Sequence, residues 1–175
     1  RLFGGGLVSS GDQTQAALLL GIDPAREARV SMLLDNLEGS APAPGGYEIA
    51  VGAEMARQLG LTNGDELVVV APAADGSMGN DLFTLVGLFS TGTPMLDANY
   101  AMLDIADLQY LMAMDPGRVH EVVMTVTRAR ETPAIAGSLA NSLEAGNREL
   151  DVKSWVELRP ELSEAVALMD SMNFV

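Results

Sequence analysis

Residues that could catalyse a reaction or hold a metal ion are few in this chain. His120 is the only histidine, and there is no cysteine. One chain therefore cannot supply a multi-histidine metal site, a Ser-His-Asp triad with a spare ligand, or a thiolate nucleophile. His120 lies between Val119 and Glu121 at the edge of a predicted strand. We expect its imidazole to have a structural or solvent-facing role.

Acidic side chains are plentiful, with 24 Asp and Glu residues in all, but the most conspicuous ones fit structural roles. Asp97, Asp104 and Asp107 flank a predicted strand and the start of a predicted helix. Helix caps and the helix dipole explain them better than acid–base catalysis does. We predict no catalytic residue and no bound cofactor, and we expect that the protein is not an enzyme.

Two loops have part of a ligand-binding pattern. Gly4–Gly6 could cradle a phosphate only with a strand before it and a lysine-bearing helix after it, and the SSGDQTQ that follows has no lysine. Ala73–Asp81 offers too few oxygen atoms at alternate positions to bind calcium. We predict a weakened strand at the first, a hairpin turn at the second, and no metal site.

Ten methionines could also form a soft-metal site or an adaptable apolar surface. Most of them, such as Met55 and Met124, fall at core-like positions, and we interpret these as packing residues. Met95, Met112 and Met114 lie near predicted loops instead and are candidates for contacts with other molecules.

Composition narrows the classes of partner. The chain has 175 residues, a net charge of −14, a pI near 4.2 and a mean hydropathy of +0.20. A chain of this length can bury a real core. The acidic balance argues against binding to nucleic acid or to anionic lipid. No run approaches the ~20 apolar residues needed to span a bilayer. The start RLFGGG, without methionine or signal peptide, suggests a piece of a larger protein.

Apolar patterning predicts strands interspersed with short helices. We expect strands at 2–8, 16–22, 47–51, 66–70, 82–89, 99–103, 121–126 and 150–152. We expect a short helix capped by Asp23 with Pro24 at its first position, and a helix at 53–59 that ends at Gly60. We expect further helices at 104–114, capped by Asp104, and at 132–143 and 155–175. The segment Gly39–Gly46 (GSAPAPGG) is rich in proline and glycine, which indicates a loop. We interpret this loop as the passage from a first group of elements into a second subdomain.

Four segments carry motifs in a consistent order. The longest, FTLVGLFSTGTPMLDANYAMLDIADLQYLM, combines V-G-x-F, a glycine, an aspartate before a strand and a D-x-Q helix, formed here by Val86, Gly87, Phe89, Gly92, Asp97, Asp107 and Gln109. The others are GIDPAREARVS, IAVGAEMARQLGLTNGDELVVV and SWVELRPEL. Together they resemble the extracytoplasmic domain of ABC-transporter permeases of the MacB and LolC/LolE type, the FtsX-like permease family.

The resemblance implies an α+β fold, the MacB-like periplasmic core. Residues 1–40 and 97–175 would form a porter-like strand-helix-strand α/β layer, and residues 41–96 an inserted β-rich sabre-like subdomain. Within the porter-like part, the order strand-helix-strand would give a right-handed crossover between 121–126 and 150–152 if these two strands were parallel neighbours.

The resemblance also implies where the chain would meet the membrane. Arg1 and the helix around Phe174 would lie at the same end of the molecule. Residues 172–175 would then be the stub of a membrane helix.

The implied function is that of a non-catalytic domain that contacts a substrate or partner and couples to ATP-driven export or lipoprotein release. An ATP-binding subunit or domain would hydrolyse ATP, and the chain itself lacks G-x-x-x-x-G-K-[ST]. The intact transporter would contain a permease dimer in the cell inner membrane, with this domain on the periplasmic, extracytoplasmic face. A periplasmic protein, or a lipoprotein or peptide substrate, would be its partner.

In the lipoprotein-releasing members of that family, a short loop after the D-x-Q helix holds the partner protein. The matching residues, called the contact loop below, are Met114, Asp115, Pro116, Gly117 and Arg118. They offer an apolar side chain, a turn and a cation. The alternative is a tight helix-to-strand turn, because this loop is slightly shorter than theirs and lacks their asparagine and aromatic character.

Two other classes of protein stay open on the sequence. The segment IAVGAEMARQLGLTNGDELVVV also occurs in similar form in β-barrels, so the chain could be a barrel-like accessory or binding domain of a larger cytoplasmic enzyme. A secreted hydrolase is the third candidate, and the lack of a recognisable catalytic site argues against it. A hydrophobic helix before Arg1 and three after Val175 would favour the permease.

Overall fold

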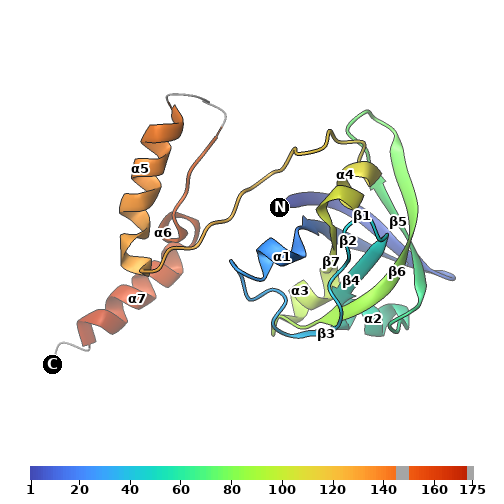
Figure 1. Cartoon of the computed structure of the whole chain (residues 1–175). Coiled ribbons are helices and arrows are strands. Elements are labelled where there is room, and N and C mark those ends of the chain that lie inside the picture. Colours follow the sequence, from blue (N-terminus) through green and yellow to red (C-terminus); the bar gives the residue numbers. More distant parts are fainter. Residues whose placement is uncertain (145–149, 173–175) are drawn as a thin grey trace. The chain divides into compact units, whose positions relative to one another are not determined.

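The computed structural model describes residues 1–144 and 150–172, without the side chains at 144 and 167–172. The chain forms two compact units, Arg1–Met124 and Thr125–Val175, and each is described by itself. The first unit contains, in chain order, β1 (Leu2–Ser10), β2 (Gln13–Ile22), α1 (Pro24–Glu27), β3 (Leu37–Gly39), β4 (Glu48–Gly52), α2 (Ala53–Leu59), β5 (Glu66–Pro72), β6 (Met78–Phe89), α3 (Pro94–Asn99), β7 (Tyr100–Asp104) and α4 (Ile105–Leu111) (Figure 1).

The strands of the first unit form one sheet that closes into a barrel. Their order is β3-β6-β4-β7-β2-β1-β5, and β5 pairs with β6 as well as with β1. The long strand β6 pairs with β5 from Met78 to Thr84 and with β3 from Gly87 to Phe89. Closure satisfies the backbone groups that an open sheet would leave at its edges.

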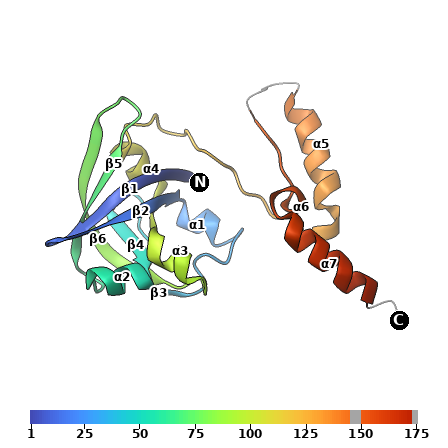
Figure 2. The same ribbon diagram turned by 180° about the vertical axis from the view of Figure 1, so that it is seen from behind.

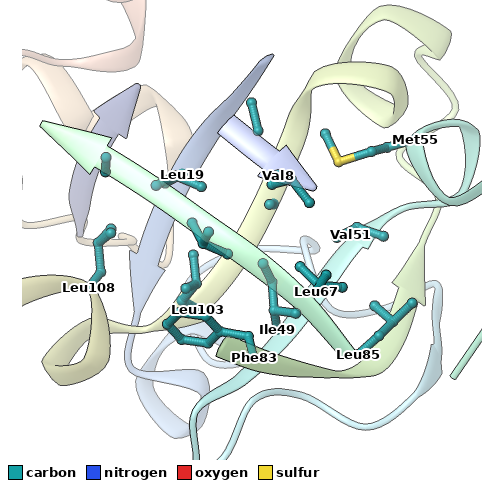
Figure 3. Packing of buried hydrophobic residues seen from close by; sticks show 14 of the residues in the cluster. Val8, Leu19, Ile49, Val51, Met55, Leu67, Phe83, Leu85, Leu103 and Leu108 are labelled. Carbon is teal, nitrogen blue, oxygen red and sulfur yellow. The ribbon is translucent and has the colours of Figure 1, made fainter. Parts of the chain in front are cut away.

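The barrel interior holds the main apolar cluster. Along β5, every second residue is buried, as expected for a strand with one face on a core. Figure 3 shows the side chains of Ile49, Leu67 and Phe83 converging from three strands. The helices α2 and α4 lie at opposite ends of the barrel in Figure 1 and in the reverse view of Figure 2, and they add Met55 and Leu108 to this cluster.

The second unit consists of helices. It contains a 3-10 turn at Ala129–Glu131, α5 (Thr132–Glu144), α6 (Trp155–Leu158) and α7 (Pro160–Met172). Ser154 and Glu157 form a capping box that starts α6. The predicted helix 155–175 is thus broken at Arg159, because Pro160 disfavours a helical conformation in the residue before it. The prediction for the terminal stub, including Phe174, lies outside the described residues.

The triple glycine does not interrupt the first strand, which is more regular than we expected. β1 pairs with β2 along its whole length, from Leu2 with Gly21 to Ser10 with Gln13. Close packing explains the glycine at position 6, since a Cβ there would lie 2.7 Å from the backbone oxygen of Val70. A larger residue would therefore push β1 away from β5.

The strands predicted at 121–126 and 150–152 are wrong, and with them the crossover between these segments. Both ranges lack strand structure. In the first, backbone bonds join Glu121 to Arg1, but the described residues provide no ladder for Val122 and Met124, which are 74% and 62% exposed. A run of β-branched residues becomes a strand only when a partner strand is present. Met124 is likewise not the core residue that we predicted.

The mixed α/β content agrees with the predicted fold class, but the predicted division of the chain does not coincide with the two units. Strands from 41–96 pair with strands from 1–40 and 97–175 in the single sheet. The loop Gly39–Gly46 joins β3 to β4, and both of these strands pair with β6. Loop composition therefore marks a surface connection here, whereas strand pairing decides which segments share a core.

Candidate partner-contact site

The D-x-Q motif forms the helix that supports the contact loop. α4 begins where the Asp104 carboxylate accepts a hydrogen bond from the Ala106 amide at 2.9 Å, as predicted for its N-cap. Leu108 and Leu111 face the barrel core. The two polar residues of the motif, Asp107 and Gln109, are also buried, at 5% and 7% exposed. A buried polar side chain needs a hydrogen-bond partner, and each of these two holds a different loop.

Asp107 holds the turn before β4. Its carboxylate accepts a hydrogen bond from the Tyr47 amide at 3.2 Å, at a residue with φ of +50°. Burial raises the pKa of Asp107; the Tyr47 hydrogen bond opposes this rise, and the carboxylates of Asp104, Asp81 and Glu48 add to it. The acidic side chain thus has a structural role at an electrostatic cost.

Gln109 holds the contact loop at both ends. Its side-chain amide donates to the backbone oxygen of Arg118 at 2.7 Å, and its backbone oxygen accepts from the Met114 amide at 2.9 Å. The five residues predicted as a site are therefore one turn, with its base clamped to α4. Gly117, at φ of +85°, occupies a conformation that few other residues adopt.

The side chains of the contact loop divide into two kinds. Met114 is half-buried and packs against the barrel cluster. Asp115 and Arg118 form an ion pair of 3.4 Å with side chains 81% and 73% exposed, and Pro116 is exposed. The loop therefore presents a charged surface to solvent, and the Met114 side chain attaches it to the barrel cluster.

A groove of about 410 Å³ adjoins the contact loop. It lies between α1 and the segment after α4, and its apolar lining is Val30, Ile105, Val119, Val122 and Val123. At one side the Arg1 guanidinium donates to the buried Glu27 carboxylate at 3.0 Å and also pairs with Glu121.

Glu27 is the central acceptor of this ionic cluster. Burial would raise the pKa of Glu27, but the hydrogen bonds from Arg1 and Ser31 outweigh it and hold this pKa below its ordinary value. Sequence reasoning missed the cluster. Arg1, Glu27 and Glu121 are far apart in the chain, so no local pattern indicates that they pair.

His120 is exposed and has the structural role that we expected. Its Nδ1 accepts a hydrogen bond from the Phe3 amide at 3.0 Å, and its ring stacks on that of Phe3 with centroids 6.4 Å apart. Within the described part of the chain, no three histidine, cysteine or acidic residues are grouped so that they could hold a metal ion.

The other motif residues also serve local structure. The Asp97 carboxylate accepts from the amide and the hydroxyl of Thr91 at 2.8 and 2.7 Å, which closes the loop at Gly92. Gly52 contacts the same turn so closely that a Cβ there would lie 2.0 Å from the backbone oxygen of Asp97. In residues 1–144 and 150–172, every helix is too short or too polar to cross a bilayer.

The fold is that of a known class of transporter domain. The structure is similar to the crystal structure of the extracellular domain of the noncanonic ABC-type transporter YknZ from Gram-positive bacteria. The TM-score is 0.55 at 12% sequence identity, and the match covers 87% of this chain and 75% of that one. At this identity the similarity concerns the fold alone. No protein-family model matches the sequence.

The sequence is similar to permeases of one particular type. The chain is 35% identical over 113 residues to the lipoprotein-releasing system transmembrane protein LolC of Xylella fastidiosa, which covers 60% of the chain and 27% of that protein. It is 25% identical over 177 residues to LolC of Neisseria meningitidis, which covers 97% of the chain and 42% of that protein. These relatives and the fold support the resemblance that the motifs predicted, to an extracytoplasmic domain of an FtsX/LolC-like permease. It spans less than half the length of these relatives.

Proposed function

We propose that this chain is a non-catalytic domain on the periplasmic side of the inner membrane, and that it couples contact with a substrate or partner to ATP-driven export or lipoprotein release. The observation that carries the proposal is the match to LolC of Neisseria meningitidis along 97% of the chain. The ATP-binding partner, a permease dimer and the cargo, a lipoprotein or peptide, belong to the proposal and concern the whole transporter.

The contact loop is the part of this domain that we assign to the partner. The clamp by Gln109 supports this assignment, because a turn fixed at its base loses little conformational entropy on binding. The exposed Asp115 and Arg118 would meet a partner with complementary charges. A periplasmic protein is the partner class that the resemblance implies.

The closed barrel is the observation that favours the second candidate, a barrel-like accessory or binding domain of a larger cytoplasmic enzyme. The similarity to LolC of Neisseria meningitidis favours the first, because it covers 97% of the chain and so extends beyond the barrel into residues 125–175. The sequence on either side of the domain in its full-length protein discriminates the two. Membrane helices there support the permease, whereas an enzyme domain contradicts it.

The contact loop is tested in the full-length permease, reconstituted with its ATP-binding subunit. Arg118→Glu should lower the transport rate at least about fivefold, the factor that corresponds to about 1 kcal/mol of lost contact. Met114→Asp should have a similar or larger effect. Arg57→Glu is the matched control, because Arg57 is also exposed, at 72%, and also forms an ion pair with an acidic residue three positions away, Glu54.

Folding of each variant is checked by circular dichroism. If Arg118→Glu and Met114→Asp both fold and transport at the wild-type rate, the loop is only a connection between α4 and the segment that follows. The wider assignment to a permease would survive that result, since it rests on the relatives.

A further inference from the structure

Two exposed tyrosines stand together beside the C-terminal end of α4. Tyr110 is 69% exposed and Tyr47 is 38% exposed. Their rings meet edge to face, with centroids 6.4 Å apart at 83°, and Tyr47 also packs on the buried ring of Phe83 at 5.8 Å. The backbone of Tyr47 is held on both sides, by Asp107 and by the Thr84 amide at 2.9 Å. The Tyr47 part of this aromatic surface is therefore fixed in place.

A cleft of about 240 Å³ lies between Tyr110 and the β5–β6 hairpin. We call it the tyrosine cleft; its lining includes Ser77, Gly79, Asn80, Asp81, Tyr110 and Ala113. Its walls are joined tightly, because the Ala74 amide donates to the Met112 oxygen at 2.8 Å. A Cβ at Gly79 would lie 1.8 Å from the Leu111 oxygen. The cleft is thus built from two elements in close contact and is not a gap in a loose loop.

The charge around the tyrosine cleft is negative. Asp81 lines it, and the same carboxylate, with Tyr110 and Asp107, adds to the effect of burial in raising the pKa of the Tyr47 hydroxyl. The carboxylates that raise the pKa of Asp107 include Asp81 and Glu48. The titratable groups that act on these two residues are thus carboxyl groups and a phenol. The last carbonyls of α4 add partial negative charge at the same place.

We propose that the tyrosine cleft receives an arginine side chain of a partner protein. A cation complements the negative cleft, and a tyrosine face beside a carboxylate attracts a guanidinium through cation–π and charge-assisted contacts. The flat guanidinium can lie on the Tyr110 ring while it donates to Asp81, which the compact ammonium of lysine cannot do. The net charge of −14 favours a basic partner in general.

The tyrosine cleft borders the contact loop, because Ala113 directly precedes Met114. One partner could therefore touch both, but the inference does not depend on the loop. It would stand if Arg118→Glu left transport unchanged.

The test uses the 175-residue chain and N-acetyl-L-arginine amide as the probe, followed by nitrogen-15 NMR. We expect saturable shifts that centre on the amides of Gly79, Tyr110 and Ala113. N-acetyl-citrulline amide, which has the same shape without the charge, should bind at least about threefold more weakly, within the range of a cation–π contact. Equal binding of the two probes would overturn the proposal.

Variants separate a specific cleft from general attraction to an acidic protein. Asp81→Asn and Tyr110→Ala should each weaken the probe about threefold or more. Asp12→Asn removes one carboxylate from the exposed β1–β2 turn and should leave binding unchanged. If Asp12→Asn weakens binding as much as Asp81→Asn does, the shifts report diffuse charge and the proposal is wrong. The amide spectrum of each variant verifies that it folds; should Tyr110→Ala fail, the comparison of Asp81→Asn with Asp12→Asn decides.

Discussion

The side-chain amide of Gln109 donates a hydrogen bond of 2.7 Å to the backbone oxygen of Arg118. This bond joins the last turn of α4 to the far end of the contact loop, nine residues on in the chain. The backbone oxygen of the same glutamine accepts from Met114. One buried residue therefore determines the shape of the turn that we assign to partner contact.

Gln109→Leu should loosen the contact loop. It removes the donor to Arg118, and we expect a loss of about 1 kcal/mol in the free energy of unfolding, with faster hydrogen exchange at Met114. Urea unfolding and amide exchange measure the two effects. Gln13→Leu, at an exposed position of β2, is the control and should stay within about 0.5 kcal/mol of wild type. Unchanged exchange in Gln109→Leu would contradict the clamp.

Gly6→Ala and Gly5→Ala should have opposite effects although the two residues are neighbours in β1. The new Cβ at Gly6 would approach the Val70 oxygen to 2.7 Å, whereas the one at Gly5 would meet nothing within 4 Å. We expect a loss of about 1–3 kcal/mol at Gly6 from the forced shift. At Gly5 we expect a small gain, because alanine restricts the unfolded chain. Urea unfolding followed by circular dichroism decides, and equal effects would refute the packing argument.

The pair of Arg1 and Glu27 should stabilise the fold at neutral pH and fail in acid. The pKa of Glu27 is lowered in the folded state. Its contribution is therefore complete above the ordinary carboxyl pKa of about 4.3 and is lost as the pH falls through the folded pKa. Glu27→Gln should cost about 1–2 kcal/mol at neutral pH, less than for a fully buried pair because Arg1 is partly exposed and keeps Glu121.

Glu27→Gln should also reduce the loss of stability that the wild-type protein shows as the pH falls into the acid range. Glu54→Gln, which removes an exposed pair with Arg57 on α2, should leave that loss nearly unchanged because solvent screens exposed pairs. Should the two variants behave alike, the burial of Glu27 would have no energetic consequence.

Asp107→Asn should stabilise the protein at neutral pH. The folded pKa of Asp107 is raised, so ionisation of this carboxyl opposes folding at pH values above its ordinary pKa of about 3.9. Asparagine keeps an oxygen for the Tyr47 amide and carries no charge. The gain should disappear as the pH falls toward 4, where the wild-type carboxyl becomes neutral.

Asp107→Ala is the contrasting variant. It leaves the Tyr47 amide without its acceptor and should cost about 1–3 kcal/mol. Thermal unfolding of both variants at two pH values gives the comparison. A loss of stability in Asp107→Asn at neutral pH would show that the charge itself is needed.

The sequence by itself determined the features that depend on a few neighbouring residues. The cap at Asp23 with Pro24 after it, the helix Ala53–Leu59 ended by Gly60 at φ of +66°, and the cap at Asp104 were all predicted and confirmed. Each follows from hydrogen bonds or backbone angles within one turn of chain. The motif order led to the permease resemblance in the same way, as a linear property of the chain.

Only the tertiary structure decided the features that join distant residues. The bond of Arg1 to Glu27 spans 26 residues and that of Tyr47 to Asp107 spans 60, and no local pattern indicates which residues pair. The glycine-rich segment Leu2–Ser10 forms a regular strand because β2 and β5 pair with it. The β-branched run at 121–126 does not form a strand, because within the described residues its backbone hydrogen bonds reach only Arg1. Hydrogen bonds across the sheet offset the conformational entropy lost on ordering a segment only where a partner strand lies at the right distance. The position of that strand is a property of the closed barrel and cannot be read from the segment itself.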